Sequence, residues 1–306
     1  MSTGGAAQPS PPPPSGAPVL VTAATGTVGR DVVEGLLAAG ADLRAASRDP
    51  QRAAASLPAG ARTVRFDLAD RGTWQPPLEG VRAVFLVRPP EQARARQGLL
   101  PFVDAVVAAG VQRVVFLSVQ GAGRNRLLPH RAVEDHLRRS GTAWTFLRAG
   151  YFLQNLVTVH RAEIRDRGEI FVPAGSGRTA FVDTRDVAEV AVRALTQPGH
   201  ERRAHELTGS EAPTYDDVAA VLTEVLGRPV RCARPGPVEY VREQLRRGMP
   251  PPLVLVTLVL YTTARLGLAG HLSDDLARVL GRPPRTVRDF VRDHADAWRP
   301  AGRDRS

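Results

Sequence analysis

The loop Thr22–Gly29 is the part of this chain whose residue types and spacing point most clearly to chemistry. An apolar run, Val19–Val21, leads into it, and apolar residues at helical spacing follow over residues 31–39, where Gly40 ends the helix. Backbone N–H groups at the start of such a helix bind a pyrophosphate when no side chain intervenes. We therefore predict a dinucleotide-binding loop with Thr22, Ala23, Thr25, Gly26, Thr27, Val28 and Gly29 in contact with the cofactor.

Two glycines of this loop match the fingerprint G-x-x-G-x-x-G. Gly26 and Gly29 hold its second and third glycine positions, and Ala23 stands at the first. A two-glycine match is weak evidence, because glycines at a strand-to-helix turn also serve packing alone. At the first position an alanine is tolerated if its backbone keeps φ negative, and cofactor binding is then weakened but not abolished.

The end of the next expected strand, residues 42–47, adds a second signal. An NAD-selective site would place an acidic residue there, whereas this chain has Ser47 and Arg48. The planar donors of arginine match the oxygens of a 2′-phosphate. The sequence therefore favours NADP(H) over NAD(H). An exposed loop arginine in an arginine-rich protein is the alternative interpretation.

Three further expected strands end in residues that could bind a ligand. In open α/β sheets, ligands bind at the carboxyl ends of the strands. An aspartate in that place can accept a hydrogen bond from the adenine amino group, or it can cap a short helix that follows. The candidate residues are Asp67 with Leu68, Val87 with Arg88, and Ser118.

The composition excludes several kinds of chemistry. The chain has 306 residues and a net charge of +10, and all 41 of its basic residues are arginine. Without lysine there is no Schiff base, no phosphate-loop lysine and no Tyr-x-x-x-Lys pair. The arginines are scattered, so nucleic-acid binding is not expected. The single cysteine, Cys232, forms no internal disulfide, and no cysteine cluster is present to bind a metal.

No stretch of the chain has the length or composition of a membrane segment. The N-terminus lacks the basic and apolar regions of a secretory signal. The longest apolar stretch, residues 253–264, falls short of the roughly 20 residues that span a bilayer, and we expect it to be a buried helix. We predict a cytoplasmic protein that does not associate with membranes.

Strands and helices alternate regularly in the first half of the chain. Six apolar strand patterns, at 19–21, 42–47, 62–68, 81–87, 113–118 and 143–148, predict an α/β fold: a Rossmann-type doubly wound parallel sheet with a smaller C-terminal α+β substrate lobe. The expected boundaries are a disordered tail at 1–17, a Rossmann domain at 18–150 to which 181–196 return, a substrate lobe at 151–180 and 197–298, and a tail at 299–306.

Seven segments together resemble the NmrA-like family of atypical short-chain dehydrogenases/reductases, close to its quinone oxidoreductase type 2 branch. They are Val21–Gly29, Ser47–Pro50, Asp67–Leu68, Phe116–Ser118, His130–Gly141, Thr145–Asn155 and Phe181–Ala188. The resemblance covers residues 18 to 298. It implies an NADP-binding domain, a small substrate lobe and, in some members, NADPH-dependent reduction of quinones or related small carbonyl and azo compounds. Other members are cofactor-sensing regulators.

The chain departs from the resemblance at the usual catalytic pair. Where many members have tyrosine and lysine, it has Arg126 and His130. His130 resembles a histidine of some quinone-reductase-like members and could bind the nicotinamide ribose, or it could make a local hydrogen bond early in its helix.

Two main functions therefore remain open. In an NADPH-dependent reductase, Ser118 and His130 would orient nicotinamide and substrate, while Tyr151 and Asn155 would hydrogen-bond the substrate oxygen. A quinone accepts hydride with little help, so the missing tyrosine is not fatal. The alternative is a non-catalytic NADP-responsive binding protein, and a non-redox tailoring enzyme is a third reading. We expect a small, apolar substrate and a monomer or homodimer.

Overall fold

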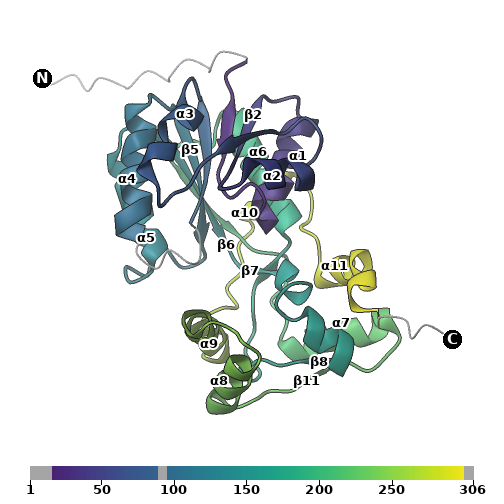
Figure 1. The fold of residues 1–306 in the computed structure, drawn as a ribbon. Helices are drawn as coiled ribbons and strands as arrows, with labels where there is room; N and C mark the ends of the chain where they lie inside the picture. Colours follow the sequence, from purple (N-terminus) through teal and green to yellow (C-terminus); the bar gives the residue numbers. More distant parts are fainter. Residues whose placement is uncertain (1–15, 89–94, 300–306) are drawn as a thin grey trace, which may run out of the picture. The chain divides into compact units, whose positions relative to one another are not determined.

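The computed structural model describes residues 16–88 and 95–299 (Figure 1). Most of the expected N-terminal tail and nearly all of the C-terminal tail lie outside these residues. So do Pro89 and Pro90, which were expected to end the fourth strand, and the expected start of the following helix.

A seven-stranded sheet confirms the predicted fold class. Its order, β10-β6-β5-β4-β1-β2-β3, contains the doubly wound arrangement in which the first strand lies at the centre and the chain crosses to both sides. β1 pairs in parallel with β2 and with β4, so that Val21 faces Ala45 on one side and Phe85 on the other. The strands are β1 Val19–Val21, β2 Leu43–Ser47, β3 Arg62–Arg65, β4 Ala83–Val87, β5 Arg113–Val119, β6 Ala143–Ala149 and β10 Arg203–Leu207.

β10 is a seventh strand beyond the six that were expected from the sequence. The Arg202 amide donates to the Trp144 carbonyl, and the Gly150 amide donates to the Leu207 carbonyl, so β10 runs parallel to β6. β10 is an edge strand whose exposure alternates along its length. Its sequence, Arg-Ala-His-Glu-Leu, therefore lacks the continuous apolar run that identified the central strands.

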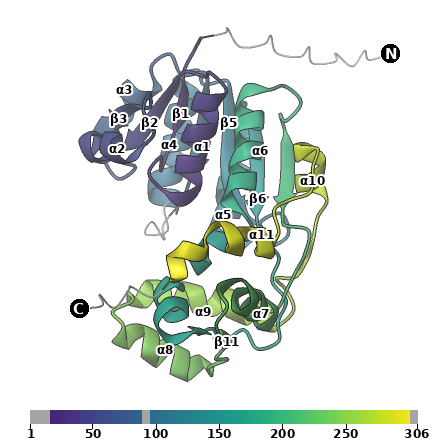
Figure 2. The same cartoon turned by 90° about the vertical axis from the view of Figure 1, so that its right-hand side faces the viewer.

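Helices cover both faces of the sheet. α1 (Thr27–Ala38) and α6 (Thr184–Thr196) run side by side on one face (Figure 2). Gly35 of α1 lies against the Val192 side chain of α6. α4 (Ala95–Ala108) and α5 (Pro129–Arg139) lie on the other face. Shorter helices are α2 (Pro50–Ser56), α3 (Gln75–Leu78) and the 3₁₀ turn η1 (Arg71–Thr73).

The chain contacts divide the protein into two compact units. The first contains residues up to 117, together with 125–146 and 191–203. The second contains residues 118–124, 147–190 and those from 204 onward. The first unit holds β1 to β4 and the loop before α1, and the second holds Tyr151 and the C-terminal helices.

The second unit has its own hydrophobic core, in which Trp298 and Phe290 are fully buried. Two small parallel pairs support it: β7 (Tyr151–Phe152) with β9 (Phe181–Val182), and β8 (Glu169–Ile170) with β11 (Arg231–Cys232). Its helices are η2 Leu153–Leu156, the π-helix η3 Glu163–Arg167, α7 Tyr215–Leu226, α8 Pro237–Arg246, α9 Pro251–Arg265, α10 Asp275–Leu280, α11 Val287–Asp293 and η4 Ala295–Trp298.

The apolar stretch 253–264 does form a helix, α9, but the expectation that it is buried was wrong. Val254, Tyr261 and Ala264 point into the core, whereas Leu255 is 62% and Val256 54% exposed. Both faces of this helix are apolar and only one is covered, which hydrophobicity alone does not reveal. No helix in the described part of the chain combines the length and apolarity needed to cross a membrane.

Candidate cofactor and substrate site

The predicted cofactor loop forms the N-terminal end of α1. Gly26 is the N-cap of this helix and has no side chain to cap it, so the amides of the first turn point outward. Thr25, Gly26 and Thr27 are exposed, whereas Val28 and Gly29 are buried. The helix dipole and these N–H groups together favour an anion. The loop therefore fits a pyrophosphate group.

Ala23 does not keep the negative φ on which its tolerance depended. Its φ is 50°, in the left-handed region that favours glycine. The Gly26 amide donates to the Ala23 carbonyl over 2.9 Å, so this conformation closes the turn. A left-handed alanine costs about 1–2 kcal/mol. The backbone at Ala23 thus has the conformation expected of the first glycine of the fingerprint, although the residue carries a methyl group.

The two glycines of the loop meet different surroundings. The position of a Cβ at Gly29 is already filled by the Ala23 carbonyl and by the backbone of Ala24. A Cβ at Gly26 would lie 3.1 Å from the Ala23 carbonyl oxygen and otherwise faces open space. Gly29 therefore permits close packing of helix on loop, and Gly26 keeps the exposed side of the loop free.

Thr22, predicted to contact the cofactor, has its hydroxyl engaged in the sheet. It is 3% exposed, its Oγ1 donates to the Phe85 carbonyl at 2.9 Å, and it accepts from the Val87 amide at 2.9 Å. These bonds join the ends of β1 and β4. Thr22 and Val87 thus hold together the strand ends from which the loop begins.

Arg48 is exposed at the end of β2, next to β1. Ser47 forms a compact turn before it, in which its Oγ donates to the Asp49 carbonyl at 3.0 Å and accepts from the Asp49 amide at 3.2 Å. Asp49 then caps α2 by accepting from the Arg52 amide. The hydroxyl of Ser47 shapes the turn, and the Arg48 guanidinium extends from it.

Asp67 lies just after β3, and its local bonds are now defined. Its Oδ1 accepts from the Ala69 amide at 2.9 Å, and its carbonyl accepts from Trp74 Nε1 at 2.9 Å. Asp70, not Asp67, caps the short helix that follows, so the helix-cap reading of Asp67 was wrong. Leu68 is buried in the core, at 7% exposure. A contact from Asp67 to adenine stays a prediction.

His130 and Arg88 are neighbours in the first unit. Burial, and then the positive charge of Arg88, lower the pKa of His130 to about 4, so the imidazole is neutral at neutral pH. Burial also lowers the pKa of Arg88. The His130 ring lies 6.0 Å from that of Phe116, between centroids, and its Nδ1 is buried without a hydrogen-bond partner among the described residues. The local bond considered for His130 is therefore not made at Nδ1.

The other predicted catalytic residues belong to the second unit. Ser118 is 1% exposed near the end of β5, on the same face of the strand as Phe116. The Tyr151 hydroxyl hydrogen-bonds Asn155 and Tyr215, and it lies 3.0 Å from the Tyr261 hydroxyl. Burial raises the pKa of Tyr151 to about 12, so it remains a phenol at neutral pH.

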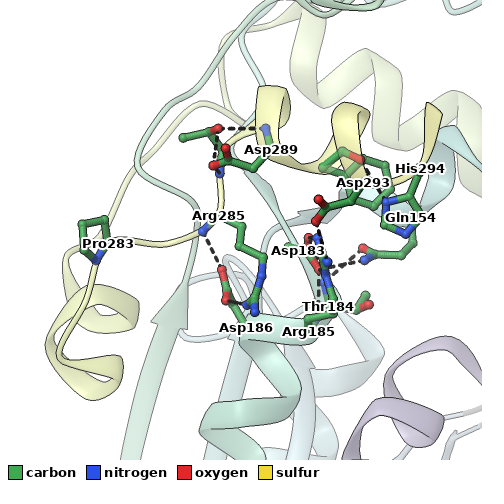
Figure 3. A network of polar contacts seen from close by, with 12 residues as sticks. Gln154, Asp183, Thr184, Arg185, Asp186, Pro283, Arg285, Asp289, Asp293 and His294 are labelled. Carbon is green, nitrogen blue, oxygen red and sulfur yellow. Dashed lines mark hydrogen bonds and ion pairs between the residues drawn. The ribbon is translucent and has the colours of Figure 1, made fainter. Parts of the chain in front are cut away.

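A polar network fixes the segment that carries Tyr151 and Asn155 (Figure 3). The Gln154 side chain donates to Asp183 Oδ1 at 2.8 Å and accepts from the Thr184 amide at 3.0 Å. Asp183 also accepts from the Arg185 amide at 2.9 Å, which caps the start of α6. Burial disfavours the Asp183 carboxylate, but its bonds to Arg185 and Gln154 outweigh this and lower its pKa.

The same network holds the C-terminal segment (Figure 3). Arg185 bonds both Asp183 and Asp293 of α11, at 2.6 Å and 2.7 Å. The fully buried Asp186 accepts from the Arg285 amide at 2.7 Å and from Arg282 at 2.8 Å. The start of α6 is thus tied to η2 and to α11.

Sequence reasoning missed a line of buried polar residues behind Tyr151. His160 and Glu163 are 2% and 5% exposed, and Tyr261 is 1% exposed. No motif links these positions, because about a hundred residues separate His160 from Tyr261.

The sheet order and the glycine-dependent loop before α1 define a Rossmann-type dinucleotide-binding fold. A model of the NmrA-like family matches residues 16–262, and the protein belongs to that family.

Among characterised relatives, an NAD(P)H azoreductase of Xenophilus azovorans is 36% identical over 92% of this chain and 99% of its own. The NADPH-dependent quinone oxidoreductase QOR2 of Escherichia coli, solved with NADPH, matches at a TM-score of 0.80 and 26% identity, over 91% of this chain and 99% of its own. Citrobacter sp. triphenylmethane reductase, solved with NADP(H), matches at a TM-score of 0.78 and 26% identity, over 90% and 99%. The resemblance stated from the sequence is confirmed.

Proposed function

We propose that this protein is an NADPH-dependent reductase of quinones or related small carbonyl or azo compounds. The proposal rests on the exposed N-terminal end of α1 and on the loop before it, which packs so closely on Gly29 that no side chain fits there. Similar proteins named as azoreductase and quinone oxidoreductase match nearly the whole chain, which supports the same class of reaction here.

The chain's own residues suit NADP(H). The amides of Thr27, Val28 and Gly29 would bind the pyrophosphate, and Thr25 and Gly26 would line the exposed side of the loop. Arg48 would bind the 2′-phosphate, which favours NADP(H) over NAD(H). The bound cofactor would supply the hydride.

A second set of residues would meet the nicotinamide ribose. The neutral His130 has a buried Nδ1 without a partner in the described part of the chain, which suits a hydrogen bond to a ribose hydroxyl. Arg88 adds positive charge beside it. Ser118, at the end of a central strand, would help to orient the ring.

Tyr151 and Asn155 would bind the substrate oxygen. Both are partly exposed and hydrogen-bonded to each other, and Tyr151 keeps its proton at neutral pH. A phenol and an amide can stabilise the oxyanion that forms when hydride adds to a carbonyl or quinone. We further propose that the substrate is a small apolar molecule. We also propose that the protein is cytoplasmic and that it is a monomer or a homodimer.

A non-catalytic NADP-responsive protein is the second candidate. The observation in its favour is that Arg126 and His130 replace the tyrosine and lysine of the usual pair. Such a protein would use the same loop to bind cofactor.

Turnover separates the two candidates. The full chain is mixed with NADPH and a panel of quinones and azo dyes, and NADPH consumption is followed together with loss of the acceptor. The reductase proposal expects acceptor-dependent oxidation of NADPH. NADPH binding without turnover on any acceptor would favour the sensor.

A further inference from the structure

A continuous line of hydrogen bonds runs inward from the Tyr151 hydroxyl. The Tyr151 and Tyr261 hydroxyl oxygens lie 3.0 Å apart, and Tyr261 Oη lies 3.0 Å from His160 Nε2. His160 Nδ1 lies 3.2 Å from Glu163 Oε2. Glu163 Oε1 pairs with Arg247 and accepts from Gln244 at 3.4 Å. The line is confined to the second unit.

The middle of this line is buried and both of its ends are partly exposed, so the Tyr151 end can meet a small molecule. Tyr261, His160 and Glu163 are almost completely buried. Tyr151 is partly exposed, and at the far end Arg247 keeps 23% of its side chain exposed. A buried carboxylate and imidazole are costly unless paired, so the arrangement must be held by its partners.

The proton positions follow from the partners. Glu163 is disfavoured as a carboxylate by burial, but its bond to His160, the charge of His160 and that of Arg247 lower its pKa below the ordinary value. A carboxylate only accepts, so His160 Nδ1 must carry a hydrogen and donate to it. Burial raises the pKa of Tyr261 far above its usual range, and it stays a phenol.

The charge of His160 then sets the direction in which each hydroxyl of the line donates its hydrogen bond. When the imidazole is neutral, Nε2 accepts from Tyr261, which accepts from Tyr151. When His160 is an imidazolium, Nε2 donates to Tyr261 and Tyr261 donates to Tyr151. Tyr151 then no longer donates its hydrogen to Tyr261 and can donate it to a ligand. One proton on His160 thus changes Tyr151 from a hydrogen-bond acceptor to a donor toward a ligand, while toward Tyr261 it changes from donor to acceptor.

We propose that Glu163, His160 and Tyr261 form a proton relay that supplies the Tyr151 hydroxyl, which protonates the reduced substrate. The inference rests on the proposed reductase function and assigns it a source for the proton. Tyr151 is the catalytic residue of this step, and the three behind it are positioning residues.

The transfer balances with one proton and no further electrons. After hydride addition, the substrate anion takes the Tyr151 hydrogen. Tyr151 recovers a hydrogen from Tyr261, and Tyr261 recovers one from His160 Nε2. His160 changes from imidazolium to neutral imidazole, and Glu163 stays a carboxylate. After the product leaves, water returns one proton to His160 along the same line.

Two acceptors distinguish proton delivery from hydride delivery. A quinone takes a hydride and a proton to become a quinol. A cationic triphenylmethane dye takes hydride alone, because the new C–H bond neutralises its charge and gives a neutral product. A defect in the relay should therefore slow the first reaction and spare the second.

Tyr261→Phe breaks the relay by removing one hydroxyl, and Tyr240→Phe is the matched control. Tyr240 is equally buried, packs against Tyr261 with ring centroids 5.7 Å apart, and donates to Thr257 at 2.8 Å, outside the relay. The relay predicts that Tyr261→Phe lowers kcat for the quinone by about 10- to 100-fold, with KM and dye turnover within about twofold of wild type. Tyr240→Phe should leave all of these unchanged.

The outcomes separate the relay from the function on which it rests. Quinone turnover by Tyr261→Phe equal to that of Tyr240→Phe would overturn the relay. So would an equal loss on quinone and dye, which would indicate structural damage. If the wild type reduces only the quinone, a fall in kcat without a change in KM supports the relay, and a change in KM alone contradicts it. Absence of wild-type turnover on every acceptor would instead remove the reductase function itself.

Discussion

The carbonyl oxygen of Ala23 occupies the space in which Gly29 would carry a Cβ. The first and third positions of the fingerprint are therefore packed against each other. The left-handed backbone of Ala23 turns its carbonyl toward the helix, where it also accepts from the Gly26 amide. The conformation of the cofactor loop thus depends on a small residue at each of these places.

Gly29→Ala and Gly26→Ala should have different effects. At Gly29 the methyl overlaps backbone atoms, so we expect a loss of about 1–3 kcal/mol in the free energy of unfolding and weaker NADPH binding. At Gly26 the methyl meets one oxygen at 3.1 Å and otherwise faces the exposed surface, so stability should change little while NADPH binding weakens. Urea unfolding and NADPH titration measure the two effects. Equal losses of stability would contradict this view of the loop.

Ala23→Gly should stabilise the protein. Glycine adopts a φ of 50° without the alanine penalty, but it makes the unfolded chain more flexible, which leaves a net gain of about 0.5–1 kcal/mol. Ala24→Gly is the control, because Ala24 is fully buried and does not have a positive φ, so this change should destabilise. Thermal unfolding compares the two. A lower melting temperature for Ala23→Gly would show that the left-handed turn is not strained.

Arg48→Ala should weaken NADPH binding and leave NADH binding nearly unchanged. The guanidinium would make a charge-assisted contact of about 1.5–3 kcal/mol with the 2′-phosphate, which corresponds to a loss of about 10- to 100-fold in affinity. Arg139→Ala, an exposed arginine at the end of α5, controls for the change in net charge. Both affinities are measured by titration. Equal losses for the two cofactors would refute the phosphate contact.

His130 should make stability depend on pH in the acid range. Its pKa is about 4 in the folded protein against 6.5 as the ordinary value, so between these values the unfolded chain binds the proton and the folded chain does not. The free energy of unfolding therefore has its full value with respect to His130 above pH 6.5. It falls between pH 6.5 and pH 4, by at most roughly 3 kcal/mol.

The test compares wild type with His130→Asn by urea unfolding from pH 7 to pH 4. As the pH falls, the unfolding free energy of wild type should decrease more than that of His130→Asn. His271→Asn, at an exposed histidine, should show the same pH dependence as wild type. A difference that stays constant with pH would mean that His130 titrates alike in both states.

The sequence predicts the doubly wound sheet because its central strands are continuous apolar runs. It limits the cap of α6 to Asp183 or Thr184 because capping is a local property, and in the structure Asp183 is the cap. β10 was missed because an edge strand need not be apolar. The sign of φ at Ala23 was not predictable from a residue type that normally avoids the left-handed region.

Contacts between residues far apart in the sequence were the features that the sequence predicted least well. Gln154 reaches Asp183, and Tyr261 meets His160 across about a hundred residues, through pairings that no local spacing encodes. The low pKa of His130 likewise depends on burial beside Arg88, because His130 lies in α5 and Arg88 follows β4. Such features follow from the folded arrangement and leave no periodic signal in the chain.

The consumption of NADPH in the presence of a quinone or azo acceptor tests the central claim most directly. The full chain should oxidise NADPH in fixed proportion to the acceptor reduced, with each NADPH supplying two electrons. Gly29→Ala should reduce this rate at NADPH concentrations that saturate only the wild type. Tight NADPH binding without oxidation on any acceptor would contradict the account and would identify the protein as a cofactor-responsive binding protein.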